Sequence, residues 1–226
     1  MENKINFDNY SKNYNDLLQE QHKSFGDIEY YSKYKVTILK TLFDSKEQLN
    51  ILEYGCGIGR NLKYLQESYL NSNIYGFDIS QDSIKIAKHK NHSVTFMDEK
   101  DFDKYSNFFD IIFIAGVFHH IETNSRDIVT KKISYLLKKD AISIIFEHNP
   151  FNPLTRHMVN TCEFDRDAKL LKRRELLGLF IKNNFKNEKS NYTLFFPPKL
   201  KFLNFLEKYL GWIPVGGQYY ILVKKK

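Results

Sequence analysis

The stretch ILEYGCGIGRN, residues 51–61, decides the fold of this chain. A short apolar run ends at the acid Glu53 and breaks into three alternating glycines, Gly55, Gly57 and Gly59. An apolar run that ends in a glycine turn and continues into a helical pattern predicts a strand followed by a helix. Such a turn presents backbone N–H groups and the positive end of a helix at the carboxyl edge of a sheet, where open α/β sheets bind ligands. We therefore expect a ligand turn here.

The spacing of the glycines excludes two common ligands of such turns. A dinucleotide fingerprint needs glycines at relative positions 1, 3 and 6, and the last of these positions is occupied by Arg60. A phosphate-binding P-loop needs a Gly-Lys-Ser/Thr sequence, which does not follow the turn.

Strand and helix signals alternate from about residue 35 to residue 190, which predicts a doubly wound, mostly parallel α/β sheet of the Rossmann-like type. The expected strands are 49–55, 73–80, 93–98, 109–116, 141–148, 191–196 and 218–224. The expected helices are 8–20, 30–43, 59–67, 81–89, 125–138, one within 167–185, and an amphipathic helix at 199–210. The seventh strand is expected to return antiparallel, and the N-terminal helices with the 199–214 segment are expected to form a lid.

Composition narrows the class of protein. With 226 residues, of which 42% are hydrophobic, the chain can bury one sizeable core. No apolar run approaches the roughly 20 residues that cross a bilayer, and the start MENKINFDNY lacks the apolar core of a signal peptide, so a cytoplasmic location is expected. The net charge of +7 is spread over scattered lysines, which favours solvated faces over a nucleic-acid surface. Cys56 and Cys162 lie outside any CxxC pair or zinc spacing, so neither a disulfide framework nor a metal site is expected.

Four motifs in order resemble the cofactor site of class I S-adenosylmethionine-dependent methyltransferases. They are the Glu53–Gly59 turn, Asp78 at the end of the second strand, Asp98 at the end of the third, and FDIIFIAGVFHHI at 109–121. The resemblance covers about residues 35–190 and implies S-adenosylmethionine as cofactor, with S-adenosylhomocysteine as product. It also implies a single methyltransferase domain over 1–226, with a helical cap at 1–33, a cofactor-binding core at 34–190 and acceptor-side elements at 191–226.

The resemblance implies a role for each cofactor residue. The methionine part of the cofactor lies over the glycine turn, Asp78 accepts hydrogen bonds from the ribose, and Asp98 receives the adenine amino group, with Glu99 as a rival. For both aspartates, capping of the following helix is the alternative, and Ser80 or Asp82 is a plausible cap. Tyr10 or Tyr14 closes over the cofactor or packs its own helix, and Arg60 faces the cofactor carboxylate or solvent. The complete predicted set is Tyr14, Glu53, Gly55, Cys56, Gly57, Gly59, Arg60, Asp78, Ile79, Met97, Asp98, Glu99 and Ala115.

Two polar clusters follow the fourth and fifth strands. Histidine titrates near neutral pH, so His119 or His120 is a candidate base, although one of the pair can instead pack under the sheet. In EHNPFNPLTRH, residues 147–157, the prolines stiffen a loop that can aim polar groups at an acceptor, or that serves only as a structural turn. The predicted catalytic residues are His119, His120, Glu147 and His148, and the predicted acceptor-binding residues are Asn149 and Arg156.

The 147–157 segment, together with CEFDRDA at 162–168, resembles small bacterial methyltransferases of polysaccharide and surface-glycan gene clusters. This favours O- or N-methylation of a small polar acceptor, including anionic ones, in capsule or polysaccharide biosynthesis, by a monomer or homodimer. One alternative is a lipid or quinone methyltransferase, because aromatic residues and lysines alternate in FPPKLKFLNFLEKYLGW, residues 196–212. Another is a non-catalytic, cofactor-binding regulatory subunit. Nucleic acid is not expected, since AGVF stands where amino methyltransferases of nucleic acids carry a [DNS]PP[YFW] motif.

Overall fold

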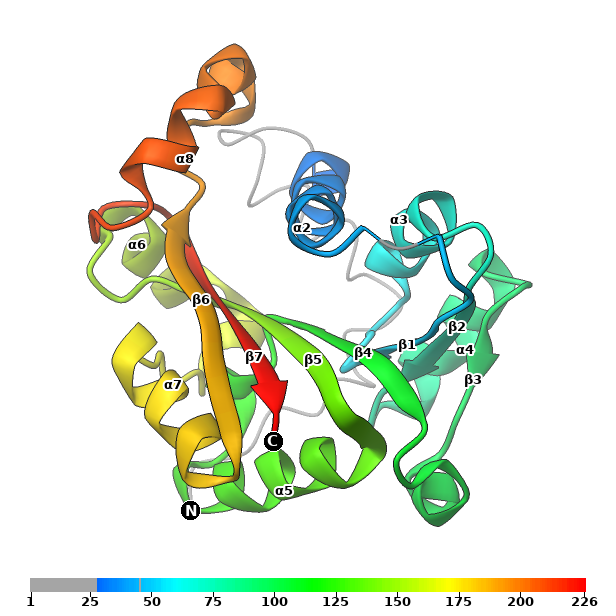
Figure 1. Ribbon diagram of the computed structural model, residues 1–226. Coiled ribbons are helices and arrows are strands. Elements are labelled where there is room, and N and C mark those ends of the chain that lie inside the picture. Colours follow the sequence, from blue (N-terminus) through cyan, green and yellow to red (C-terminus); the bar gives the residue numbers. More distant parts are fainter. Residues whose placement is uncertain (1–27, 45) are drawn as a thin grey trace.

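A seven-stranded sheet of order β3-β2-β1-β4-β5-β7-β6 forms the centre of the computed structural model, which describes residues 28–44 and 46–226 (Figure 1). The four strand pairs from β3 to β5 are parallel, whereas β7 runs antiparallel to both β5 and β6. This confirms the predicted Rossmann-like class with an antiparallel last strand. The strands are β1 (Asn50–Tyr54), β2 (Asn73–Phe77), β3 (Thr95–Phe96), β4 (Phe109–Ala115), β5 (Leu137–His148), β6 (Phe185–Thr193) and β7 (Gln218–Lys225).

Helices cover both faces of the sheet, as Figure 1 shows. One layer contains α2 (Ile28–Leu42), α3 (Arg60–Ser68) and α4 (Gln81–Lys90), and the other contains α5 (Arg126–Leu136), α7 (Arg173–Lys182) and the 3-10 helix η2 (Glu99–Tyr105). The central strand β4 alternates between the two layers: Ile111 and Phe113 pack in one core, Ile112 and Ile114 in the other. Each such buried side chain stabilises the fold by about 1.5–3 kcal/mol, which explains the unbroken apolar run.

The glycine turn connects β1 to α3 and draws three strand ends together. The N–H groups of Gly55 and Cys56 donate to Phe77 O at 2.8 and 2.9 Å, which ties the turn to the end of β2. Gly55 has φ +77°, and a Cβ there would lie 2.4 Å from Val117 Cγ2, in the loop that follows β4. Only glycine allows this close approach, so the turn sits beside the ends of both β2 and β4.

The sixth strand and the segment after β5 differ from the predictions. The sixth strand covers 185–193 rather than 191–196, because its first half, FKNEKS, is a mostly exposed edge strand without an apolar alternation. The segment after β5 forms a helix, α6 (Pro153–Thr161), instead of a stiff loop. Pro153 stands in its first turn, where no N–H is needed, and the Asn152 side chain caps it by accepting from Thr155 N at 2.9 Å.

The predicted amphipathic helix at 199–210 is replaced by a 3-10 stretch, η6 (Pro198–Leu206), and a short α8 (Glu207–Leu210), with non-helical dihedrals at Leu200. The Glu207 carboxylate accepts from the backbone N–H groups of Leu194 and Phe195, both at 3.1 Å, and from the Tyr34 hydroxyl of α2. This anchor ties the segment to the end of β6 and to α2, at the expense of a regular helix. The predicted helix at 8–20, with Tyr10 and Tyr14, lies outside the described residues.

Among the helices that the structure describes, none has the length and apolar character needed to cross a membrane.

Candidate active site

A cavity of about 340 Å³ opens at the carboxyl edge of the sheet, over the ends of β1, β2 and β4. Its lining contains many of the predicted site residues, namely Gly55, Cys56, Gly57, Arg60, Asp78, Ile79, Ala115 and His120. It also contains Asn61 and Asp167, which the sequence did not suggest. Glu53, in β1, and Gly59, the residue before α3, belong to the same turn but not to the lining.

Asp78 follows β2 and holds the glycine turn in place. Its Oδ2 accepts from Gly57 N at 2.7 Å and its Oδ1 accepts from Ser80 N at 2.9 Å. A carboxylate offers about four lone-pair positions, so Asp78 is chemically suited to accept from a ligand in the cavity that it lines. The predicted alternative, capping of α4, is taken by Ser80, whose side chain accepts from Ser83 N at 3.1 Å.

Glu53 and Asn61 form a buried acceptor pair beneath the turn. Asn61 Nδ2 donates to Glu53 Oε1 at 2.6 Å. Glu53 Oε2 and Asn61 Oδ1 are both buried and have no hydrogen-bond partner among the described residues. Buried polar atoms are almost always hydrogen-bonded, so two orphaned acceptors beside a cavity indicate a missing donor such as an ammonium group. Asn61 was missed because it lies in the helix, outside the glycine pattern.

The residues at the end of the third strand do not take the place in the cavity lining that the sequence predicts. Asp98 caps η2 by accepting from Glu99 N at 2.8 Å, and it also pairs with Lys100 at 3.4 Å. Glu99 pairs with Lys132 on α5, and Met97 is buried in the core. None of these three side chains belongs to the lining formed by the described residues. The capping alternative stated for Asp98 is thus what the structure shows, and an adenine contact remains only a prediction.

His119 and Glu147 form a buried pair behind the cavity. The Glu147 Oε1 atom accepts from Val117 N at 3.0 Å and from Phe118 N at 2.7 Å, and Oε2 lies 2.6 Å from His119 Nδ1. Burial alone would lower the pKa of His119, but the neighbouring Glu147 and Asp165 carboxylates raise it to about 10. Burial would raise the pKa of Glu147, but the charge on His119 holds it below its ordinary value. Their role in catalysis remains a prediction.

Asp165, in the 3-10 turn η5 (Glu163–Asp165), faces the histidine pair. Its Oδ1 lies 3.6 Å from His119 Nε2 and 3.3 Å from His120 Nε2. The loop that carries it is pinned by Lys169 N, which donates to His119 O at 2.8 Å, and by Arg126, which donates to Lys169 O at 2.8 Å. The sequence spacing did not predict the contact between Asp165 and the histidines, because β5 and α6 lie between them in the chain.

The remaining predicted residues have separate positions. The His148 ring lies 5.1 Å from the His119 ring, and burial lowers its pKa to about 4, so it is neutral at physiological pH. Asn149 is fully buried; it donates to Pro214 O and Gly216 O at 3.1 and 2.7 Å and accepts from Phe151 N, which fixes the loop before β7. Arg156 is exposed on α6 and does not line the cavity. We therefore do not carry Asn149 and Arg156 into the proposed site.

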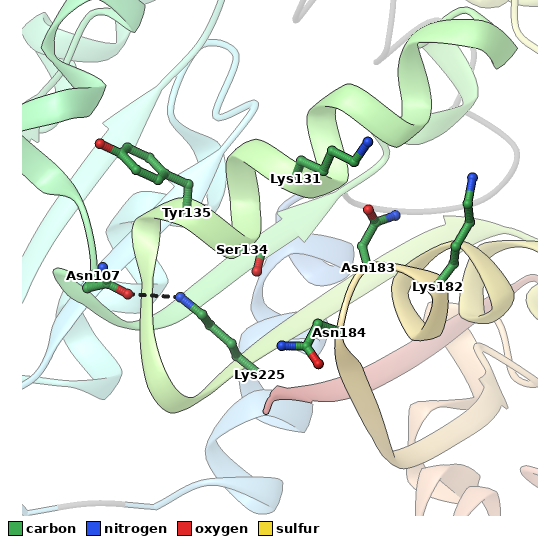
Figure 2. A pocket seen from close by; sticks show the side chains of 8 residues that line it. All are labelled: Asn107, Lys131, Ser134, Tyr135, Lys182, Asn183, Asn184 and Lys225. Atoms are coloured by element: carbon green, nitrogen blue, oxygen red, sulfur yellow. Dashed lines mark hydrogen bonds between the residues drawn. The ribbon is translucent and has the colours of Figure 1, made fainter.

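A second hollow, of about 420 Å³, lies at the opposite, amino edge of the sheet (Figure 2). Its lysines are already engaged. Lys131 and Lys182 pair with Asp127 at 2.8 and 3.4 Å, and Lys225 donates to Asn107 Oδ1 at 2.9 Å, as the dashed line in Figure 2 marks. This hollow lacks a convergent set of reactive groups, so it is a surface feature rather than a second site.

Comparison with known proteins agrees with this geometry. Residues 26–190 match the model of a family described as a methyltransferase domain. The chain belongs to the class I S-adenosylmethionine-dependent methyltransferases. This methyltransferase is 27% identical over 198 residues to an uncharacterized protein of Rickettsia prowazekii, and the match covers 79% of each chain.

Solved structures share the fold of the methyltransferase. A methyltransferase of Thermotoga maritima, described as a possible histamine N-methyltransferase, superposes with a TM-score of 0.70 at 19% identity, over 97% of this chain and 98% of that one. Phosphoethanolamine N-methyltransferase 2 of Haemonchus contortus, in complex with S-adenosyl-L-methionine, gives 0.65 at 17% identity, over 98% of this chain and 60% of that one.

The cofactor of the methyltransferase is S-adenosylmethionine, and the residues present fit it. Its ammonium group is the kind of donor that Glu53 Oε2 and Asn61 Oδ1 lack. Arg60, in the lining at the start of α3, is suited to its carboxylate, and Asp78 is suited to its ribose hydroxyls. A Cβ on Gly57 would meet nothing within 4 Å, so the turn leaves open space on its cavity side.

Replacing Glu53 by Gln should stabilise the methyltransferase while weakening cofactor binding. Burial raises the pKa of Glu53 to about 8; Asn61, Lys35 and Arg60 act against this rise, and Asp78 adds to it. Because this pKa exceeds the unfolded value, the folded state binds the extra proton, and stability is lost as pH rises from about 4.5 through about 8. The Glu53→Gln variant does not lose stability in this way, because an amide side chain does not ionise. Thermal unfolding should show its advantage growing over this pH range to at least about 1 kcal/mol, or 2–4 °C.

In the same variant, affinity for S-adenosylmethionine should fall at least about tenfold. The ammonium group of the cofactor should favour the ionised form of Glu53, and a charge-assisted hydrogen bond is worth about 1.5–3 kcal/mol. Glu67→Gln, an exposed change on the same helix as Asn61, is the control and should alter neither property. Unchanged cofactor affinity in Glu53→Gln would show that the orphaned acceptors do not meet the ammonium group.

Proposed function

We propose that the methyltransferase methylates an oxygen or nitrogen of a small polar acceptor that binds beside His120. The main support is that His120 and Asp167 line the same cavity as the glycine turn and Asp78. When bound, S-adenosylmethionine supplies the electrophilic methyl group. The chain's own part is to hold the acceptor in line with that group and to activate an acceptor that carries a proton. The cluster of His119, His120 and Asp165 is the set of side chains at this wall suited to that activation.

The cations near the cavity support an anionic acceptor. Lys35 on α2 interacts electrostatically with Arg60, Glu53 and Glu147, and burial lowers its pKa to about 8. It therefore stays largely charged at neutral pH. Its positive charge can attract a carboxylate or phosphate on the acceptor. The names of the two structural neighbours, a possible histamine N-methyltransferase and a phosphoethanolamine N-methyltransferase, also refer to small polar acceptors.

A role in surface polysaccharide biosynthesis rests on the 147–157 and 162–168 segments. These two segments meet in the structure, because Glu147 of the first and Asp165 of the second both face His119. The residues that carry the resemblance thus share one cluster at the cavity. This convergence supports a common chemical purpose for them, and a sugar or sugar nucleotide is the acceptor that we propose for it.

Transfer of a deuterated methyl group to metabolite extracts tests the proposal. The protein is incubated with labelled S-adenosylmethionine and bacterial small-molecule extracts, and products are detected by mass spectrometry. A labelled sugar, sugar nucleotide, phosphate ester or amine is expected with the wild type and not with Asp78→Ala. Cofactor binding without any labelled small molecule would contradict the proposed acceptor class.

A lipid acceptor at a membrane surface is the second candidate, favoured by one observation. The 198–215 segment exposes Phe202, Phe205, Tyr209 and Trp212 by 64–74%, with exposed Lys199, Lys201 and Lys208 among them. Aromatic side chains among lysines suit an anionic interface. Under the small-acceptor proposal, the protein stays in the supernatant with phosphatidylcholine vesicles, with or without phosphatidylglycerol. Co-sedimentation that requires phosphatidylglycerol and is lost in Phe202→Ser/Trp212→Ser would favour the lipid acceptor.

A further inference from the structure

Three side chains outside the cofactor contacts converge on one point at the cavity wall. His119 Nε2 and His120 Nε2 both face Asp165 Oδ1, and candidate ligand atoms of the three residues lie within 4.8 Å of one another. We propose that His119, His120 and Asp165 bind one divalent transition-metal ion, zinc being the first candidate. The site itself rests on geometry, whereas its use in activating the acceptor rests on the proposed function.

The hydrogen bonds of His119 decide which of its nitrogens is available. Glu147 accepts from two backbone N–H groups through Oε1, so its Oε2, at 2.6 Å from His119 Nδ1, is also an acceptor. The proton of His119 therefore sits on Nδ1. Because the Glu147 and Asp165 carboxylates raise the pKa of His119 to about 10, Nε2 carries a second proton at neutral pH when no metal ion is bound. When a metal ion displaces that proton, Nε2 presents a lone pair on the side of the Asp165 carboxylate. Two lone pairs facing one another repel, so the arrangement requires a cation between them, either a proton or a metal ion.

The distances are those expected for a shared metal ion. The separations of 3.6 and 3.3 Å between Asp165 Oδ1 and the two ring nitrogens are longer than an ordinary N–H···O bond of about 2.7–3.2 Å. With metal–nitrogen and metal–oxygen bonds of about 2.0–2.2 Å, two ligands of a tetrahedral zinc ion lie about 3.3–3.6 Å apart. Both separations match that value. The candidate ligand atoms of the three residues all lie within 4.8 Å of one another.

The surroundings also have the form of a metal site. A carboxylate behind a ligating histidine fixes its tautomer and raises its basicity, and Glu147 stands in that position behind His119. On the far side of the His120 ring, Asp167 Oδ1 lies 3.8 Å from Nδ1. Glu147, Asp165 and Asp167 thus place three carboxylates around the two imidazoles.

The chemistry of the ligands indicates the class of metal. Two imidazoles and one carboxylate suit zinc and other first-row divalent ions better than magnesium or calcium, which prefer oxygen ligands alone. His119 is 2% exposed and fixed, whereas His120 reaches the cavity lining. A three-ligand site leaves a coordination position for a further oxygen, and in catalytic sites such an ion lowers the pKa of the oxygen it binds. A hydroxyl acceptor would be activated in this way.

Metal titration of the untagged, chelator-treated protein tests the site. We expect the wild type to bind one cobalt(II) or zinc(II) ion per chain, followed by the visible absorption of cobalt and by competition with zinc. Loss of an outer carboxylate typically costs 10- to 100-fold in affinity, so Asp165→Asn, which removes a ligand, should weaken binding by at least about 100-fold. Glu147→Gln should weaken it about 10- to 100-fold, because an amide N–H facing Nδ1 moves the histidine proton to Nε2. His92→Gln, an exposed histidine outside the cluster, should bind like the wild type.

Each outcome has one meaning. Binding of one ion by the wild type, and its loss in Asp165→Asn, supports the site. If Glu147→Gln does not fold, Asp165→Asn alone is sufficient for the test. No binding by the wild type, or equal affinity in Asp165→Asn, overturns it and leaves a proton as the cation of the cluster. Methyl transfer that persists in metal-free protein overturns only the role in activation. Metal binding without methyl transfer to any acceptor would count against the proposed function and leave the site standing.

Discussion

Asp78→Ala is expected to weaken binding of S-adenosylmethionine by about 100-fold or more. The change removes the charged acceptor that we propose for the ribose, worth about 1.5–3 kcal/mol, and it leaves Gly57 N without its 2.7 Å partner. Both losses fall on the cofactor side, since Asp78 lines the cavity and also fixes the turn. Titration calorimetry with S-adenosylmethionine and S-adenosylhomocysteine measures the effect directly.

Two matched variants make this result interpretable. Asp78→Asn keeps one carbonyl oxygen and should give an intermediate loss. Asp82→Ala removes an exposed carboxylate a few residues away, paired with Lys85 at 2.6 Å, and should leave cofactor affinity unchanged. An affinity in folded Asp78→Ala equal to that of the wild type would contradict the placement of the ribose.

His120→Ala should lower kcat by about 100- to 10,000-fold, the range expected for loss of a group that activates the acceptor. His120 is the member of the histidine pair that lines the cavity, whereas His119 is buried behind it. The Kd for S-adenosylmethionine should change less than about fivefold, because the residues proposed for its ammonium, carboxylate and ribose groups lie at the glycine turn and after β2. Single-turnover methyl transfer and calorimetry on the same preparation separate the two effects.

His92→Ala is the control for the loss of a histidine, since this side chain is exposed before β3. It should retain the wild-type kcat. If His120→Ala kept full activity on the identified acceptor, the cluster at this wall would not be the activating group, and methyl transfer would depend on positioning alone.

The fold was readable from the sequence because its signals are local. The glycine turn, the apolar run of β4 and the position of Asp78 each follow from residues within one strand–turn–helix unit. The edge strand β6 was misplaced because its exposed half carries no apolar pattern. The 3-10 segment at 198–206 was misread because a distant anchor, Glu207 bound to Tyr34 and the end of β6, overrides local helical periodicity.

Site residues could be predicted from the sequence only where they belong to the local motifs of the strand–turn–helix units. Glu53 and Gly57 could be proposed from the turn, and Asp78 from the family resemblance and its place after the second strand. The orphaned Asn61 Oδ1 emerges only when burial is known. Asp165 and Asp167 reach the histidines across β5 and α6, so no spacing rule connects them. Conversely, Asn149 looked like a ligand for an acceptor, and its buried bonds to Pro214 O and Gly216 O show how it fixes the chain before β7.

Direct titration of the wild-type protein with S-adenosylmethionine, S-adenosylhomocysteine and NAD tests whether the glycine turn binds the cofactor. We expect one S-adenosylmethionine site per chain, competition by S-adenosylhomocysteine, no saturable binding of NAD, and loss of the signal in Asp78→Ala. Absence of saturable S-adenosylmethionine binding, or binding that Asp78→Ala leaves intact, would contradict the assignment of the glycine turn as the cofactor site.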